Sequence, residues 1–339
     1  MATIRDLADY TGFSVTTISR VLNNDPTMSV PDVTREKILE AASALHYKTT
    51  GSKKQKPVQR PLHIALVEML SKAEQLHDPY YLYLRESAVK CCMERGHNVS
   101  FIFEKNGRYQ RLGDTELDGI VAVGIFSEEQ IQQLQCLCPR IVFLDSAPDE
   151  LRFDSVVLNF QLGVQLAVDY LIECGHRHIG FLGPSNKLDQ RKRNAPEARL
   201  GYFADYMQRL GLYDEALVLD TQQTPAQTRE AVIRWSEETH PTPAAFLAYN
   251  EETAITAVSA LRERGLRVPE DISIVSINDT PLSILIEPPL TSINTHMDIT
   301  SEAALDLLTA RISAPDRLPR KIVIPMTLTE RSSVAQIGQ

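Results

Sequence analysis

The start of the chain alternates apolar and polar residues at the spacing of an α-helix, with one interruption. The apolar positions on either side of that interruption are Ile4, Leu7, Ala8, Val15, Ile18, Val21 and Leu22. Because each set falls on one helical face, the pattern predicts two short helices joined by a tight turn. Gly12 suits the backbone angles of the turn, and Ser14 stands where the N-cap of the second helix belongs.

A third helix and a linker follow. Residues 32–47 carry one apolar stripe, made of Val33, Ile38, Leu39, Ala42 and Leu45. Residues 48–61, KTTGSKKQKPVQRP, hold four lysines and two prolines, and their positive charges either follow DNA phosphates or only keep a linker solvated. The pattern therefore predicts a three-helix head over residues 1–47, a basic linker over 48–61 and a larger body over 62–331.

From residue 62 onward, short apolar runs alternate with helical stretches. The runs lie at residues 63–67, 99–103, 118–123, 140–144, 155–158, 178–182, 244–249 and 272–277. The spacing between them suits helices such as 81–95 and 163–173. Apolar strands separated by helices are typical of a parallel sheet covered on both faces, and about ten runs over about 270 residues favour two doubly wound subdomains.

Polar side chains follow several of these runs. Asp145, Asn250 and Asn278 each come directly after an apolar run, and Arg199 is expected in the opening turn of a helix that begins at Pro196. Because ligands of such sheets bind at the carboxyl ends of the strands, these residues form one candidate site. Their carboxylate, amide and guanidinium groups suit a hydroxyl-rich ligand such as a sugar. The alternative is that Asp and Asn only cap helices and close turns. Three aromatic residues either stack on a sugar ring or belong to the core: Tyr80, Tyr81 and Phe160.

Length and composition limit the class of protein. The 339 residues, with 43% hydrophobic and 23% charged content, predict a globular protein of two or three domains. The sequence contains no apolar stretch of membrane-spanning length, and its first residues, MATIRD, lack the apolar core of a signal peptide. We therefore expect a cytoplasmic protein without a membrane partner. The five cysteines lack the paired spacing of a disulfide framework or a zinc site, so they are interpreted as buried thiols.

Charge is distributed unevenly along the chain. The net charge is −9, yet residues 1–60 carry nine Lys and Arg against six Asp and Glu, a net of +3, which leaves −12 for the remainder. An acidic body with a basic head is typical of a protein whose head alone touches a polyanion.

The second predicted helix has the surface that such a contact requires. Its inward face uses Ile18, Val21 and Leu22, and no acidic residue occurs between Thr11 and Asn24. A helix in the major groove of DNA needs an outer face free of negative charge. The alternative is a helical pair that merely packs against another part of the protein.

Together these segments resemble the LacI family of bacterial transcription repressors along essentially the whole chain. The resemblance rests on TIRDLADYTGFSVTTISRVLN, VTREKILEAASALHY, DPYY, FLD, CGHRHIGFLG, PEDISIVSINDT and EPPLTSI, in this order. It is greatest to the galactoside-responsive repressors of β-galactosidase genes, on NDPTMSV, DPYYLYLR and SIND. It implies a helix-turn-helix head, a body like the periplasmic binding proteins, and a homodimer that holds a pseudo-palindromic operator in the nucleoid until a small sugar binds between the two subdomains.

The resemblance also implies roles for individual residues. Carried onto matching positions, the base-reading residues are Val15, Thr16 and Arg20. Arg20 is the best candidate to read guanine, because Arg pairs with O6 and N7 together. Further DNA contacts are expected from Thr3, Ser14, Thr17, Ser19 and Asn23, with Ser52 and Gln55 in the hinge. The sugar contacts are expected from Asp145, Arg199, Asn250 and Asn278, with Tyr80, Leu82 and Phe160 lining the cleft.

Three features depart from the family pattern. Ser52 and Gln55 stand where members usually carry an Ala and a Leu that wedges into the minor groove, and Gln cannot unstack a base step as an apolar wedge does. Asn278 replaces the Asp of several sugar-binding members. The end, SSVAQIGQ, has no leucine heptad, so we do not expect the four-chain bundle of some members.

Other functions remain as alternatives. The same parts serve a regulator that needs a co-repressor, such as a purine or a phosphosugar. A transport-type sugar-binding protein would need a signal peptide and no DNA-binding head. A sugar enzyme with a DNA-binding head would need a phosphate loop or a dinucleotide fingerprint, and neither motif occurs. We therefore expect no catalytic residue, no cofactor and no metal.

Overall fold

The chain forms two units, residues 1–60 and 61–339, and each is described here by itself. A computed structural model describes residues 3–22, 30–45, 60–69, 79–105, 107–111, 115–222, 224–238 and 244–337. Among the helices of these ranges, none has both the length and the apolar character needed to cross a membrane.

The first unit is a three-helix head. Its helices are α1 (Ile4–Thr11), α2 (Val15–Leu22) and α3 (Asp32–Ala44). They enclose a small core of Leu7, Ile18, Val21, Ile38 and Ala41. Gly12 ends α1 with φ of 73°, a left-handed conformation that glycine adopts without strain. The three predicted helices and the turn at Gly12 are confirmed.

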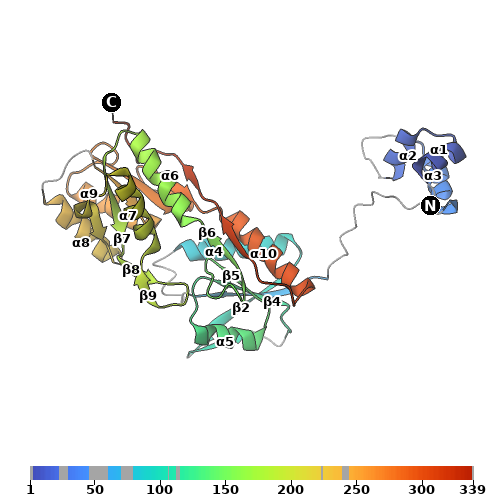
Figure 1. Cartoon of the computed structure of the whole chain (residues 1–339), viewed down its shortest axis with the longest axis horizontal. Coiled ribbons are helices and arrows are strands. Elements are labelled where there is room, and N and C mark those ends of the chain that lie inside the picture. The colour runs from blue at the N-terminus through green and yellow to red at the C-terminus, as the bar shows by residue number, and fades with distance from the viewer. Residues whose placement is uncertain are drawn as a thin grey trace. The chain divides into compact units, whose positions relative to one another are not determined.

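The first lobe of the body is built on a seven-stranded sheet. Its order is β14-β6-β5-β4-β1-β2-β3, parallel throughout except for the β2–β3 pair. The strands are β1 (His63–Glu68), β2 (Asn98–Lys105), β3 (Arg108–Arg111), β4 (Gly119–Val123), β5 (Ile141–Leu144), β6 (Asp154–Leu158) and β14 (Lys321–Ile324). Helices α4 (Pro79–Glu94) and α10 (Met297–Ser313) pack on one face, and α5 (Glu128–Leu137) packs on the other (Figure 1).

The second lobe has a six-stranded sheet of order β10-β7-β11-β12-β13-β15, antiparallel only between β13 and β15. The strands are β7 (His178–Gly183), β10 (Val218–Asp220), β11 (Ala244–Ala248), β12 (Ile272–Asn278), β13 (Thr291–Asn294) and β15 (Thr327–Thr329). Helices α6 (Phe160–Glu173) and α7 (Ala198–Leu210) cover one face; α8 (Pro225–Ser236) and α9 (Glu251–Glu263) cover the other. Two short 3-10 helices complete it, η2 (Glu215–Leu217) and η3 (Pro281–Ile284).

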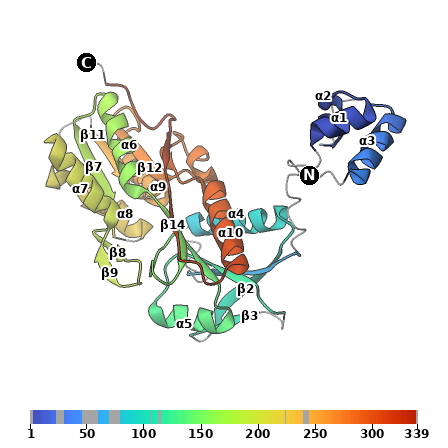
Figure 2. The same cartoon turned by 45° about the vertical axis from the view of Figure 1, so that its right-hand side comes forward.

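A separate two-stranded hairpin, β8 (Asn186–Leu188) with β9 (Asn194–Pro196), leaves the second lobe between β7 and α7 (Figure 2). The described chain also passes between the lobes at three places: from β6 to α6, from β13 to α10, and from β14 to β15. Because the strands of each sheet are almost all parallel, their carboxyl ends lie together along one edge of that sheet.

The predicted fold of a helix-turn-helix head and two doubly wound subdomains is confirmed. The predicted helices at 81–95 and 163–173 are α4 and α6. The predicted start of the next helix at Pro196 is wrong: Pro196 ends β9, and α7 begins at Ala198 because the Glu197 side chain caps it by accepting the Arg199 N–H.

Candidate functional site

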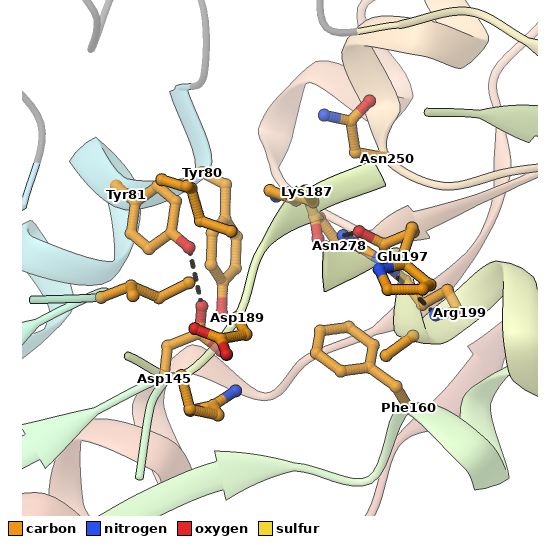
Figure 3. Close-up of a pocket in the computed structure, with 15 residues that line it drawn as sticks. Tyr80, Tyr81, Asp145, Phe160, Lys187, Asp189, Glu197, Arg199, Asn250 and Asn278 are labelled. Carbon is orange, nitrogen blue, oxygen red and sulfur yellow. Dashed lines mark hydrogen bonds and ion pairs between the residues drawn. The ribbon is translucent and has the colours of Figure 1, made fainter. Parts of the chain in front are cut away.

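A cavity of about 220 Å³ lies between the two lobes of the body. Figure 3 shows Asp145 with Tyr80 and Tyr81 on one side, and Phe160 with Arg199 on the other. The lining residues come from the helices and loops of both lobes, from the end of β12 and from the hairpin: Tyr80, Tyr81, Ile125, Asp145, Phe160, Lys187, Leu188, Asp189, Gln190, Pro196, Glu197, Ala198, Arg199, Asn250 and Asn278.

On the side of the first lobe, a carboxylate and a phenol are joined. Asp145 follows β5 with φ of 68°, an uncommon backbone conformation outside glycine that Asp tolerates better than most residues. The Tyr81 hydroxyl, on the first turn of α4, donates to Asp145 Oδ2 at 3.0 Å. The Tyr80 ring meets the Tyr81 ring edge-on, with centroids 5.1 Å apart. The bond from Tyr81 therefore holds the Asp145 carboxylate in a fixed orientation at the wall of the cavity.

On the side of the second lobe, Arg199 and Glu197 form a buried ion pair. Arg199 Nε donates to Glu197 Oε1 at 2.7 Å and Nη1 donates to the Tyr249 carbonyl at 2.8 Å, with side-chain exposures of 8% for Arg199 and 5% for Glu197. The guanidinium also lies 4.8 Å from the centroid of the Phe160 ring and 4.6 Å from that of Tyr249. This packing fixes its plane against the cavity.

Each member of the ion pair shifts the pKa of the other. Burial alone would raise the pKa of Glu197, but the adjacent charge and hydrogen bonds of Arg199 outweigh it and lower that pKa to about 2. Burial opposes the charged form of Arg199 as well, and Glu197 more than compensates, so the Arg199 pKa is raised. Both groups are therefore charged at neutral pH.

Asn250 and Asn278 enter the cavity from the ends of β11 and β12. Asn250 is the N-cap of α9, and its Oδ1 accepts the Thr253 N–H at 2.9 Å. From the sequence alone, capping a helix and lining the cavity are alternatives, but Asn250 does both. Asn278 has φ of 120°, a strained conformation for a residue other than glycine.

A buried carboxylate holds the loop beyond Asn278. Glu251 accepts the Thr280 N–H at 2.8 Å and the Thr280 hydroxyl at 2.6 Å, and it also accepts the Ser283 hydroxyl. Burial raises the pKa of Glu251. These bonds join the start of α9, next to Asn250, to the loop after Asn278, and so fix the two amides relative to each other.

The structure brings together six of the seven residues predicted for the effector, namely Tyr80, Asp145, Phe160, Arg199, Asn250 and Asn278. Leu82 is half-buried on α4 and is not among the lining residues, because the first turn of α4 directs its neighbours Tyr80 and Tyr81 to the cavity instead. Sequence reasoning missed the hairpin residues and Glu197. Only Glu197 could have been found from the sequence, because an acidic residue two positions before Arg199 is a candidate partner for its guanidinium.

In the head, α2 presents the outer face that the sequence predicted. Val15 is 41% exposed, Thr16 and Arg20 are exposed, and Thr17 and Ser19 are half-buried. This face carries no acidic residue. A face without negative charge can approach a phosphate backbone.

Two of the predicted DNA contacts also cap helices. Ser14 Oγ accepts the Thr17 N–H at 3.1 Å, as the sequence predicted. Thr3 accepts the Asp6 N–H at 3.3 Å, and its own N–H and hydroxyl donate to the Asp6 carboxylate in a capping box. The predicted contacts Asn23, Ser52 and Gln55 lie outside the described residues, as does most of the predicted linker.

The cysteines correct one expectation. Cys91, Cys92, Cys138 and Cys174 are buried, but Cys136 is exposed, because it lies on the outer side of α5. Within the described ranges, no group of His, Cys, Asp and Glu is arranged to hold a metal ion.

Comparison with known proteins places both units. The model for bacterial regulatory proteins of the lacI family matches residues 3–50, and the model for the periplasmic binding protein-like domain matches residues 168–334. The HTH-type transcriptional regulator GalR of Streptococcus thermophilus is 33% identical over 336 residues, which cover 98% of this chain and 99% of that protein.

Solved structures share the fold over almost the whole length. The transcriptional regulator CelR–cellobiose complex has a TM-score of 0.64 at 23% identity, covering 98% of this chain and 100% of that one. The lac repressor dimer bound to operator and the anti-inducer ONPF has a TM-score of 0.61 at 22% identity, covering 98% of this chain and 99% of that one.

Proposed function

From the premise that the chain belongs to the lacI family of bacterial regulatory proteins and is a DNA-binding transcription regulator, not an enzyme, we propose that it represses sugar-utilisation genes and that a small neutral sugar, a galactoside, releases it from DNA. The observation that carries this proposal is the composition of the cavity between the lobes. Its polar groups are carboxylates, amides and a guanidinium set among aromatic rings, which is the chemistry that binds sugar hydroxyls and the apolar face of a sugar ring.

The charge of the cavity favours a neutral ligand over an anion. Its lining holds three carboxylates, Asp145, Asp189 and Glu197, against two cations, Lys187 and Arg199. Arg199 already donates hydrogen bonds to Glu197 and to the Tyr249 carbonyl. Because Glu197 neutralises the positive charge of Arg199 inside the protein, a phosphosugar would gain little from the guanidinium.

The proposed mechanism joins the cavity to the heads. A sugar that contacts Asp145 on one lobe and Arg199 or Asn250 on the other favours one arrangement of the lobes. In a homodimer, that arrangement changes the separation of the two points from which the heads extend, and both heads then no longer fit the two half-sites of a pseudo-palindromic operator. The lac repressor structure noted above is a dimer bound to its operator, which supports this arrangement for the present chain.

The test begins with the DNA. The full-length protein selects its preferred duplex from a random pool, and fluorescence anisotropy then measures binding to that duplex with lactose, D-galactose, cellobiose, glucose 6-phosphate or hypoxanthine. We expect lactose or D-galactose to weaken DNA binding by about tenfold or more, a coupling within the usual allosteric range.

Asp145→Asn is the informative variant. Asn tolerates the left-handed backbone of this position, so we expect normal folding and normal DNA affinity but no sugar response. Asp316→Asn changes an exposed carboxylate away from the cavity and serves as the matched control. A normal sugar response in Asp145→Asn would show that Asp145 does not bind the sugar. Tighter DNA binding with glucose 6-phosphate or hypoxanthine would show that the effector is a co-repressor and not an inducer.

A further inference from the structure

The β8–β9 hairpin crosses from the second lobe to the first. It supplies five of the residues that line the cavity, Lys187, Leu188, Asp189, Gln190 and Pro196. Its two strands are three residues long, and their side chains are exposed or half-buried. A hairpin of this size has no core of its own and is marginally stable alone. Its position therefore depends on what its tip contacts.

The tip is a turn that Asp189 holds together from inside. The Asp189 carboxylate accepts the N–H groups of Arg191 and Arg193 at 2.8 and 2.9 Å and pairs with the Arg193 guanidinium at 2.7 Å. The hydrogen bonds from Arg193 lower the pKa of Asp189 to about 2, so it is charged at neutral pH. The three residues between Asp189 and Arg193 are thereby presented as one rigid projection.

All three of these residues bond to the first lobe. Gln190 Oε1 accepts the Ala147 N–H at 2.6 Å, and Arg191 Nε donates to the Pro148 carbonyl at 3.3 Å. Lys192 Nζ donates to Gln130 Oε1 at 3.2 Å, at the N-terminus of α5. Three consecutive residues of one lobe thus hold the other across the mouth of the cavity.

These contacts adjoin the residues proposed to bind the effector. Ala147 is two positions beyond Asp145, on the same loop. At its base, β9 leads directly through Glu197 to Arg199. A ligand that moves Asp145 relative to Arg199 therefore acts on both ends of the hairpin, on the contacts of its tip and on its base.

We propose that the β8–β9 hairpin is a latch that closes over the bound effector, contributes to its selection through Lys187, Leu188 and Gln190, and ties occupancy of the cavity to closure of the lobes. This inference rests on the proposed effector cavity. The latch is held by a few hydrogen bonds at the surface, so it opens more readily than the sheets it joins.

Limited digestion with trypsin measures the open fraction, because Arg191, Lys192 and Arg193 form three adjacent cleavage sites at the tip. When opening is fast, cleavage follows the population of the open form. We expect Gln190→Ala, which removes the acceptor of the Ala147 N–H, to speed cleavage after residues 191–193 by about two- to tenfold, the effect of one lost hydrogen bond. Gln190 is exposed, so the variant is expected to fold normally.

A second variant should act in the opposite direction. Gln130→Glu gives Lys192 a charged partner and keeps an acceptor at the N-terminus of α5, where negative charge is favourable. We expect cleavage at the tip to slow by about twofold or more. Gln208→Ala, an exposed glutamine on α7, is the matched control and should not alter the rate.

The outcomes separate the latch from the sugar response. Mass spectrometry follows each cut in the full-length protein, with and without lactose, D-galactose or cellobiose at about 10 mM, a concentration that nearly saturates a site of millimolar or tighter affinity. Faster cleavage in Gln190→Ala, slower cleavage in Gln130→Glu and protection by the sugar that releases DNA support the proposal. Equal rates in all variants overturn it, as does a sugar that releases DNA without protecting the tip. Altered rates in both variants with no effect of any sugar on DNA binding support the latch and contradict the sugar function.

Discussion

Replacing Glu197 with Gln tests the central feature of the effector cavity, its buried ion pair. The substitution keeps the size of the side chain and one acceptor oxygen, but it leaves the Arg199 guanidinium charged and almost fully buried. The remaining bond from Arg199 to the Tyr249 carbonyl does not neutralise that charge. We therefore expect Glu197→Gln to destabilise the second lobe strongly.

The structure sets the size of this effect in two ways. The pKa of Glu197 is lowered from 4.5 to about 2, and at about 1.4 kcal/mol for each pKa unit this shift corresponds to about 3–4 kcal/mol. Removing one partner of a buried ion pair generally costs about 3–5 kcal/mol. The two figures agree at about 3 kcal/mol, which is a large part of the stability of a typical domain.

Trp235 makes the measurement specific to the second lobe. It is the only tryptophan of the chain and packs edge-on against Phe246 in the core beneath α8. With a urea dependence of about 3 kcal/mol per M, a loss of about 3 kcal/mol lowers the fluorescence midpoint by about 1 M. Glu263→Gln removes a carboxylate from an exposed pair with Arg229 and should leave the midpoint unchanged. A Glu197→Gln midpoint equal to that of the control would refute the argument.

The same pair predicts a dependence on pH. Because the pKa of Glu197 is lower in the folded protein than in the unfolded chain, its contribution to stability is present above about pH 4.5 and is lost as the pH falls toward 2. The wild-type midpoint should therefore fall across this window more than that of Glu197→Gln. Parallel pH profiles for the two proteins would show that the carboxylate is not stabilised by Arg199.

Two further predictions concern the head and the thiols. Arg20→Ala should relax base preference at one operator position by about 1–3 kcal/mol, measured on a set of single-base variants of the selected duplex, and an unchanged preference would show that Arg20 reads no base. With Ellman's reagent, the native protein should show one fast thiol, Cys136, which is exposed, while burial raises the pKa of Cys92 to about 12 and delays its reaction until unfolding. Cys136→Ser should abolish the fast phase; a fast phase that persists would place a second thiol at the surface.

Much of the cavity could be predicted from the sequence because parallel sheets place their carboxyl ends at one edge. Asp145, Asn250 and Asn278 come after short, mainly apolar runs, so each residue could be assigned to that edge without knowing which strands are neighbours. Leu82 was expected from the family resemblance, not from this argument, and it does not line the cavity. It follows Tyr81 on α4, and one residue further along an α-helix turns the side chain by about 100°.

The hairpin could not be predicted, for a different physical reason. Its strands, NKL and NAP, are short, polar and partly exposed, so no alternation of apolar residues marks them. Their geometry is determined by pairing with each other and by hydrogen bonds that Gln190 accepts, and Arg191 and Lys192 donate, with partners more than forty positions away along the chain. Core strands are recognisable in the sequence because burial selects apolar side chains along them. A latch must be able to open, and it therefore keeps the polar composition of a loop. On this argument, the parts of a regulator that move with its ligand are the ones its sequence pattern indicates least.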